Sequence, residues 1–155
     1  MRKFKDVNEL VNALKPDYPV YCIRPDSIKK STKFFRDNFP GKVLYAVKTN
    51  PNERVIKQII SNGIKDFDVA SLNEIKSIKK LKPDANLFFM HTVKTKESIH
   101  SAYFDYGVRN FALDNKDELS KILNATNQAK DLNLLHDLWT LKFFLIHLCY
   151  LMQNF

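Results

Sequence analysis

A lysine and a carboxylate stand near the ends of two successive apolar runs of the sequence. Lys48 ends the run VLYAVK at 43–48, and Asp68 lies in FDVAS at 67–71. A lysine held away from water has its ammonium form disfavoured, and the neutral amine can then condense with a carbonyl group. A nearby carboxylate can hold the lysine or stabilise the protonated imine. The pair indicates carbonyl chemistry, although an exposed lysine and an aspartate bonded to loop amides fit the same pattern.

Glycine content and charge exclude two common functions. The only glycines are Gly41, Gly63 and Gly107, too far apart for a glycine-rich phosphate loop. The formal net charge is +8, but the lysines are spread along helical stretches rather than gathered in blocks with aromatic residues. We therefore interpret the charge as a solvated surface and predict no nucleic-acid partner.

The cysteines and histidines show no metal or disulfide pattern. Cys22 and Cys149 sit in hydrophobic surroundings and are predicted to be inert buried thiols. The four histidines lack ligand spacing, so no metal is predicted. His91, at the end of an apolar run, is interpreted as structural. Residues 1–14 alternate charged and apolar side chains, unlike a secretory signal, so a cytoplasmic location is expected.

From Gly41 onward, short apolar runs alternate with helical patterns. This alternation predicts an α/β fold with a parallel sheet and helices on its outer face. A closed barrel needs eight such units, and four to five fit here, so the fold predicted is a partial (β/α)8 barrel. Strands are expected near 43–48, 66–71, 86–92 and 110–114, as parallel neighbours in that order.

The starts of the predicted helices carry capping residues. Asn50 before Pro51, Ser71 with Glu74 as a capping box, Thr95 and Asp114 are the predicted N-caps. They follow the strands' C-terminal ends, the edge where such folds build active sites. Upstream, residues 18–23 are expected to form an accessory strand that leads into the first helix.

Several blocks together carry a family resemblance. The block YAVKTN at 45–50, then FDVAS with Glu74, resembles the fold-type III decarboxylases that act on ornithine, lysine or diaminopimelate. YPVY at 18–21, FFMHTVKTKESI at 88–99 and AYFDYGVRNFALDNKDEL at 102–119 resemble the same family in the same order. The resemblance covers about residues 18–134. Thr92 departs from it, because the family commonly has proline there.

The resemblance implies a pyridoxal-phosphate (PLP) barrel like that of alanine racemase, with roles for individual residues. Lys48 corresponds to the lysine that covalently holds PLP. Asp68 corresponds to the carboxylate that hydrogen-bonds within the lysine–cofactor network. Glu74 either joins that network or serves only the capping box. The family binds amino-acid substrates and forms homodimers. Its stacking histidine and phosphate-binding loop lie further along the chain than this resemblance reaches.

The resemblance stops after DLNL at 131–134. Residues 143–155 contain no Lys, Arg, Asp or Glu. They are too few to span a bilayer, so no membrane span is predicted. A buried helix, a membrane-surface segment or a changed reading frame fits this composition, and we favour the last. The predicted division is 1–134, the N-terminal part of the PLP barrel, and 135–155, a divergent hydrophobic tail without a consistent core face.

Three functions remain open on the sequence alone. The chain is a relative of ornithine/lysine decarboxylases in polyamine biosynthesis, inactive by itself because it lacks most of the active site. Alternatively, it is a non-catalytic module that associates with a full-length decarboxylase. The third reading is a PLP carrier or racemase-like barrel. Whether the chain is itself an enzyme is left undecided, as is its preference for ornithine or lysine.

Overall fold

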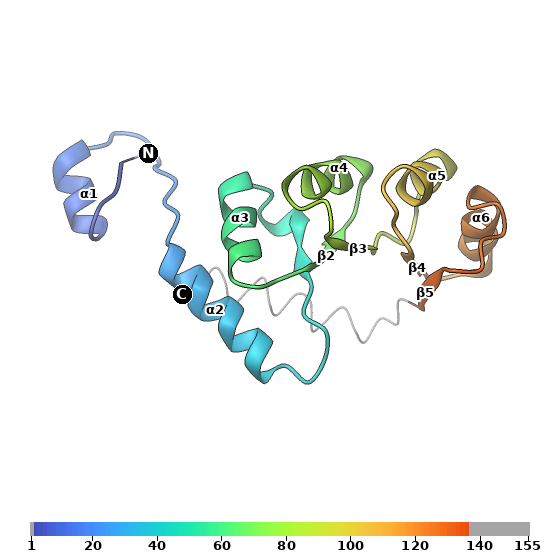
Figure 1. Cartoon of the computed structure of the whole chain (residues 1–155). Coiled ribbons are helices and arrows are strands. Elements are labelled where there is room, and N and C mark those ends of the chain that lie inside the picture. Colours follow the sequence, from blue (N-terminus) through green and yellow to red (C-terminus); the bar gives the residue numbers. More distant parts are fainter. Residues whose placement is uncertain (1, 137–155) are drawn as a thin grey trace.

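Five parallel strands with helices between them form the described part of the chain. The structure, a computed structural model, describes residues 2–136, and its sheet has the order β1-β2-β3-β4-β5 (Figure 1). All four strand pairs are parallel, which confirms the predicted order and direction. The elements are α1 (Val7–Leu14), α2 (Pro25–Asn38), β1 (Tyr45–Ala46), the 3-10 helix η1 (Val47–Thr49), α3 (Glu53–Ser61), β2 (Asp66–Val69), α4 (Leu72–Leu81), β3 (Asn86–Phe89), α5 (Lys96–Phe104), β4 (Asn110–Leu113), α6 (Lys116–Ala125) and β5 (Asn133–His136).

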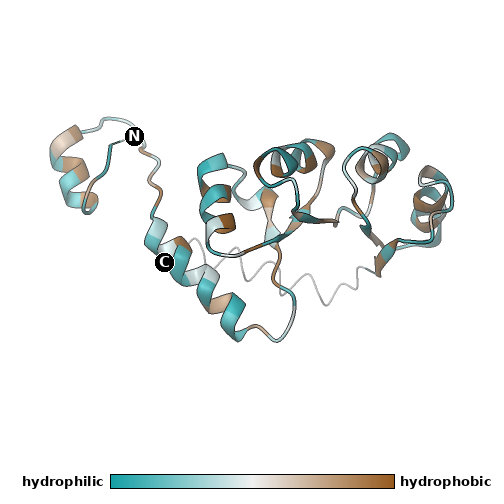
Figure 2. Cartoon of the chain, viewed as in Figure 1, coloured by the Kyte–Doolittle hydropathy of each residue, from teal (hydrophilic) through white to brown (hydrophobic). Residues whose placement is uncertain are grey.

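The core lies between the sheet and the helices that follow its strands. Alternate strand residues such as Phe67, Phe89 and Phe111 are fully buried there, because successive side chains of a strand point to opposite faces. Isoleucines at helical spacing, Ile75 and Ile78 of α4 among them, meet them from the other layer. Each such side chain contributes about 1.5–3 kcal/mol on burial. Figure 2 shows hydrophobic colour on the helix faces turned toward the sheet.

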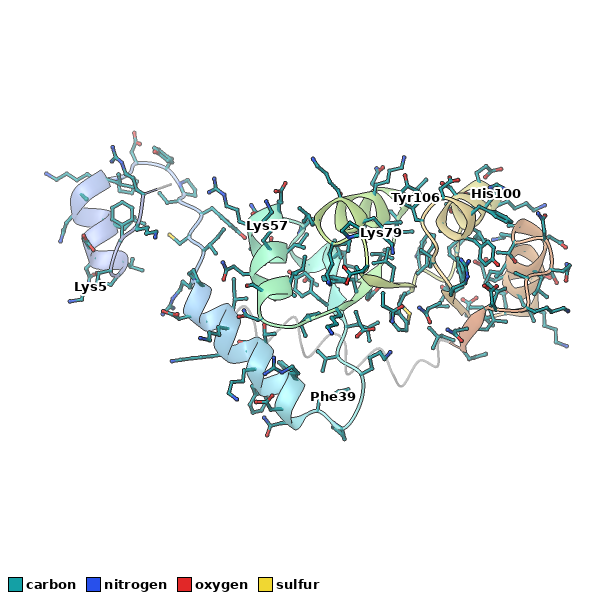
Figure 3. All side chains as sticks on the ribbon, viewed as in Figure 1. Lys5, Phe39, Lys57, Lys79, His100 and Tyr106 are labelled. Carbon is teal, nitrogen blue, oxygen red and sulfur yellow. The ribbon has the colours of Figure 1, made fainter. Side chains whose placement is uncertain are left out.

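The basic charge lies on the outward faces of these helices. Lys57 of α3, labelled in Figure 3, is exposed and pairs with Glu53 one turn earlier, with 2.6 Å between Nζ and Oε1. Such exposed pairs contribute little to stability, typically below about 1 kcal/mol. The pair of Lys57 with Glu53 therefore adds little to the stability of the core.

On the other face of the sheet, a chain of polar side chains crosses four strands. Asn133 donates to Asn110 at 3.0 Å, Asn110 to Asn86 at 3.0 Å, and Asn86 to Asp66 at 2.6 Å. A carboxylate can only accept hydrogen bonds, so Asp66 fixes which end of each asparagine side chain donates and which accepts in this polar chain. Lys42 completes it with an ion pair to Asp66 at 3.5 Å. Shifting one strand by one residue against its neighbour would break these bonds, so this polar chain of side chains specifies the register of the strands.

Two of the four predicted N-caps are confirmed and two are displaced. Ser71 and Thr95 cap α4 and α5 as predicted. For α3 the cap is Asn52, because Asn50 Oδ1 accepts from the Asn52 N–H in a tight turn that delays the helix by two residues. For α6 the cap is Asn115, whose Oδ1 accepts from the Glu118 N–H at 2.8 Å.

Asp114 lies one residue too early for that cap, and it accepts a bond from the Asn115 side-chain amide instead. The predicted cap at Asp114 was therefore wrong, and so was the one at Asn50. In both cases an asparagine further along the chain is the cap. Asn52 accepts from the N–H two residues later, and Asn115 accepts from the N–H three residues later.

The predicted strand at residues 18–23 is wrong. These residues follow α1 as an extended segment that pairs with no strand in the described part of the chain, and α1 stands apart from the sheet (Figure 1). Most of its side chains lie in water, and Tyr18 and Tyr21 are 68% and 66% exposed, although Ile23 packs against the core. Cys22 is an exposed thiol, so its predicted burial was also wrong. Cys149 lies outside the described residues.

Strand β5 reaches two residues into the predicted tail. Leu135 and His136 pair with Ala112 and Leu113 of β4. The remainder of that prediction, residues 137–155, falls outside the described residues. In the part of the chain that the structure describes, no helix is long and apolar enough to cross a membrane.

Candidate active site

Lys48 lies in a turn immediately after β1. The strand ends at Ala46, and Val47–Thr49 form a 3-10 helix rather than the continued strand that the sequence predicted. The Thr49 hydroxyl donates to the Ala46 carbonyl at 2.8 Å and closes this turn. The turn lifts Lys48 off the sheet, so its side chain is exposed to solvent. The desolvation expected for a lysine inside a strand end is therefore not present in this structure.

Asp68 lies at the same edge of the sheet, on the neighbouring strand. Its Cα is paired with that of Ala46, two residues before Lys48. The Asp68 side chain is only 5% exposed and belongs to the face of β2 opposite the helix-packed Phe67. The strand register therefore brings an accessible amine and a buried carboxylate to one rim of the sheet.

Glu74 has a capping role that the sequence predicted. Its Oε2 accepts from the Ala70 N–H at 2.7 Å, and its own N–H bonds to Ser71 Oγ at 3.3 Å. These bonds hold the turn that follows Asp68. A part for Glu74 in a lysine–cofactor network stays a prediction.

His91 follows β3 at the same rim and is exposed. Its main-chain carbonyl accepts a hydrogen bond from Lys94 Nζ at 2.9 Å. Because this contact does not involve the imidazole, the structural role of His91 stays a prediction.

A buried ion cluster next to this rim was missed by the sequence analysis. The Lys94 ammonium, in the loop between β3 and α5, has a fully buried side chain and reaches Glu118 of α6 at 2.8 Å. It also donates to the carbonyls of His91 at 2.9 Å and Ala112 at 2.6 Å, so each of its three protons has an acceptor. Lys121 binds the other Glu118 oxygen at 2.6 Å.

The cluster shifts the pKa values of its members. Burial disfavours the ammonium and lowers the pKa of Lys94, and the Glu118 carboxylate only partly opposes this. Burial also acts to raise the pKa of Glu118, but hydrogen bonds from Lys121 and Lys94 outweigh it and hold that pKa below its ordinary value. Nothing in the polar segment HTVKTK marks Lys94 as buried, which is why it escaped notice.

The fold and this rim define a class of protein. A parallel sheet in sequential order, with helices between its strands, is the arrangement of the first units of a (β/α)8 barrel. Residues 25–137 match the pyridoxal-binding domain of the pyridoxal-dependent decarboxylases, and the chain belongs to that family. PLP is the family's cofactor. An exposed lysine amine and a buried carboxylate on the same rim of the sheet fit this cofactor chemically.

Two decarboxylases are similar to this chain in sequence. The chain is 28% identical to lysine/ornithine decarboxylase of Selenomonas ruminantium over 127 residues. This aligned region covers 81% of this chain and 31% of the relative. It is 35% identical over 94 residues to ornithine decarboxylase of Neurospora crassa, covering 57% of this chain and 18% of the relative.

Solved structures of the family have the same fold. The arginine decarboxylase of Paramecium bursaria Chlorella virus, bound to agmatine, superposes with a TM-score of 0.71 at 28% identity, covering 84% of this chain and 34% of that one. Lysine decarboxylase of Selenomonas ruminantium gives 0.72 at 25% identity, covering 87% and 35%. The chain thus spans about a third of the length of these relatives.

Proposed function

We propose that this chain forms the lysine-bearing part of the PLP site of a decarboxylase acting on a basic amino acid such as ornithine or lysine. The observation that carries the proposal is the pairing of Ala46 with Asp68, which brings the Lys48 turn and that carboxylate to one rim within a matched pyridoxal-binding domain. The names of the relatives, decarboxylases of lysine, ornithine and arginine, support the substrate class.

Each residue has a definite task in this proposal. The Lys48 amine would hold the cofactor covalently, and Asp68 would accept a hydrogen bond that keeps the lysine–cofactor network in place. Glu74 and Ser71 hold the turn after Asp68 through the capping box. When bound, PLP supplies the electron sink that accepts the electrons left by departing CO₂.

We further propose that this chain does not decarboxylate by itself. The described part contains five strands, whereas a closed barrel has eight. An open sheet cannot surround a cofactor and exclude water from it. The homodimer that the family resemblance implies is likewise a proposal, to be checked by the mass of the protein in solution.

Binding of PLP to Lys48 is tested by absorbance and by mass spectrometry. Wild-type protein incubated with PLP should acquire the absorbance of lysine-bound PLP, and borohydride reduction should fix the label on Lys48. Lys48→Ala should lose this absorbance, whereas Lys57→Ala, at an exposed helical lysine, should keep it. Equal labelling of all surface lysines would refute the proposed role of Lys48.

Turnover is tested separately by assaying diamine release from ornithine and lysine. No release above the rate with free PLP is expected from the chain alone. Clear turnover that disappears in Lys48→Ala would refute the inactivity and leave the role of Lys48 standing.

A second candidate function, a non-catalytic module that binds a longer decarboxylase, is favoured by one observation. Leu134 of β5 is 41% exposed, although its partner Phe111 is fully buried. Within residues 2–136, β5 pairs with β4 alone. Co-purification with a full-length relative in a defined 1:1 complex would support this function, and two separate peaks at micromolar concentrations would exclude it.

A further inference from the structure

Asn50, two residues after Lys48, forms hydrogen bonds through three of its polar groups. Its main-chain carbonyl accepts from the Tyr45 hydroxyl at 3.1 Å. Its side-chain Oδ1 accepts from the Asn52 N–H at 3.2 Å, and its Nδ2 donates to the Tyr21 hydroxyl at 2.5 Å. Asn50 thereby joins β1, the start of α3 and the extended segment that follows α1.

These bonds fix the turn that carries Lys48. On one side, Thr49 bonds back to the Ala46 carbonyl at the strand end. On the other, Asn50 is tied to Tyr45, whose ring is buried and packs edge-to-face on Phe67 with 6.4 Å between centroids. The backbone on both sides of Lys48 is therefore attached to the core, although the lysine side chain is exposed.

The contact with Tyr21 differs from the other two because it comes from a mostly exposed segment, in which Ile23 packs against the core. Tyr21 is 66% exposed, and in the described structure residues 18–23 belong to no strand. Its hydroxyl bond to Asn50 is a polar contact between this segment and the Lys48 turn. A bond of this kind is made and broken at low cost, unlike one anchored in the core.

We propose that Asn50 is a positioning residue for Lys48, and that the extended segment at 18–23 adjusts how firmly the Lys48 turn is held, through the Tyr21 hydroxyl. The inference rests on the proposed role of Lys48 as the PLP-holding lysine. When the Tyr21 bond is made, the amide of Asn50 has both its donor and its acceptor engaged, and the Lys48 turn samples fewer conformations. When it is broken, Asn50 keeps only the bonds to Tyr45 and Asn52.

Four variants separate these bonds. Tyr21→Phe removes only the bond from the extended segment, and Tyr18→Phe is its matched control in the same segment with a similarly exposed ring. Asn50→Ala removes both side-chain bonds. Asn50→Asp keeps an acceptor for Asn52 and gives the Tyr21 hydroxyl a carboxylate to donate to, so it should restore the contact with reversed polarity.

Two measurements on the full chain report how each substitution affects the turn that carries Lys48. Hydrogen–deuterium exchange of residues 47–52 reports the turn without any cofactor. Reduction of the PLP adduct and peptide mass spectrometry report the labelling of Lys48 relative to Lys57. In Tyr21→Phe, the loss of one hydrogen bond should make exchange of residues 47–52 faster by on the order of 5-fold and should reduce Lys48 labelling by a similar factor. The unfolding temperature should stay unchanged.

The expected order of effects is Tyr18→Phe and Asn50→Asp near wild type, Tyr21→Phe intermediate and Asn50→Ala largest. Tyr21→Phe combined with Asn50→Ala should be no worse than Asn50→Ala alone, because both remove the same bond. Identical behaviour of Tyr21→Phe and Tyr18→Phe in both measurements would overturn the inference. If exchange responds as expected but wild type shows no preferential Lys48 labelling, the proposed function fails while Asn50 still holds the turn.

Discussion

At the scale of single residues, Lys94 is a buried charge whose loss would disturb the core. Its ammonium is buried with three acceptors, and its removal leaves Glu118 buried with only Lys121 as a charged partner. Breaking a buried ion pair from one side costs about 3–5 kcal/mol. Domains of this kind have about 5–15 kcal/mol of stability in total, so such a change is severe.

We therefore expect Lys94→Met to lower the free energy of unfolding by about 3–5 kcal/mol in urea titrations. Lys76→Met, at an exposed lysine of α4, should change it by less than about 0.5 kcal/mol. Replacing both partners, Lys94→Met with Glu118→Leu, should recover part of the loss because no charge is then buried alone. Equal effects of Lys94→Met and Lys76→Met would contradict the buried cluster.

Glu118 makes stability depend on acid pH. Its folded pKa is held below the ordinary value of 4.5, so its contribution is complete above that pH and disappears as pH falls through the folded pKa. Glu118→Gln should flatten this part of the acid dependence of the unfolding free energy, at the cost of lower stability near neutral pH.

A comparison with Glu53 tests whether burial matters for this dependence. The pKa of Glu53 is also lowered, by a hydrogen bond from Lys57, but that pair is exposed. Its share of the acid dependence should vanish in about 1 M salt, where exposed pairs are screened, while the share of Glu118 should persist. Loss of both shares in salt would show that Glu118 is more accessible to solvent than the structure indicates.

At the scale of elements, the sequence was sufficient to predict the alternation of strands and helices and their parallel order. Phe67, Phe89 and Phe111 mark the core face of the strands, and helical spacing of isoleucines marks that of the helices. Element ends were predicted less well, because two adjacent polar residues compete for one cap, as Asp114 and Asn115 do.

The candidate site was predictable only in part, for a related reason. The family resemblance identified Lys48 and Asp68, and the strand register then placed both at one rim. The burial of Lys94 and the contact of Asn50 with Tyr21 were not predicted, because the partners lie 24 and 29 residues away in the sequence. No local pattern encodes such contacts.

The displaced cap of α6 gives a direct test. Asn115→Ala should cost about 1 kcal/mol of unfolding free energy, because the Glu118 N–H loses its acceptor. Asp114→Ala should cost clearly less, since its carboxylate bonds only to the Asn115 side chain. Both are measured by urea unfolding at neutral pH. The reverse order would restore Asp114 as the cap.

At the scale of the whole molecule, the sheet is held by the core on one face and by the polar chain on the other. β5 belongs to the polar chain through the bond from Asn133 to Asn110, and its backbone pairs with β4 along four residues. Tyr103 and Arg109 also hold Asp131, just before β5, at 2.6 Å each. We therefore expect β5 to unfold together with the rest of the sheet, although the predicted tail began at residue 135.

Two truncations test where this unit ends. A chain of residues 1–136 keeps β5 and should retain a single cooperative unfolding transition. If residues 137–155 come from a changed reading frame, it should also be more soluble than the full chain, because those residues are rich in bulky apolar side chains.

A chain of residues 1–132 loses β5, exposes the edge of β4 and breaks the polar chain at Asn110. It should unfold at lower urea concentration and with a smaller m-value, because less surface is buried in its folded state. Loss of the cooperative transition in residues 1–136 would show instead that the segment beyond His136 completes the core.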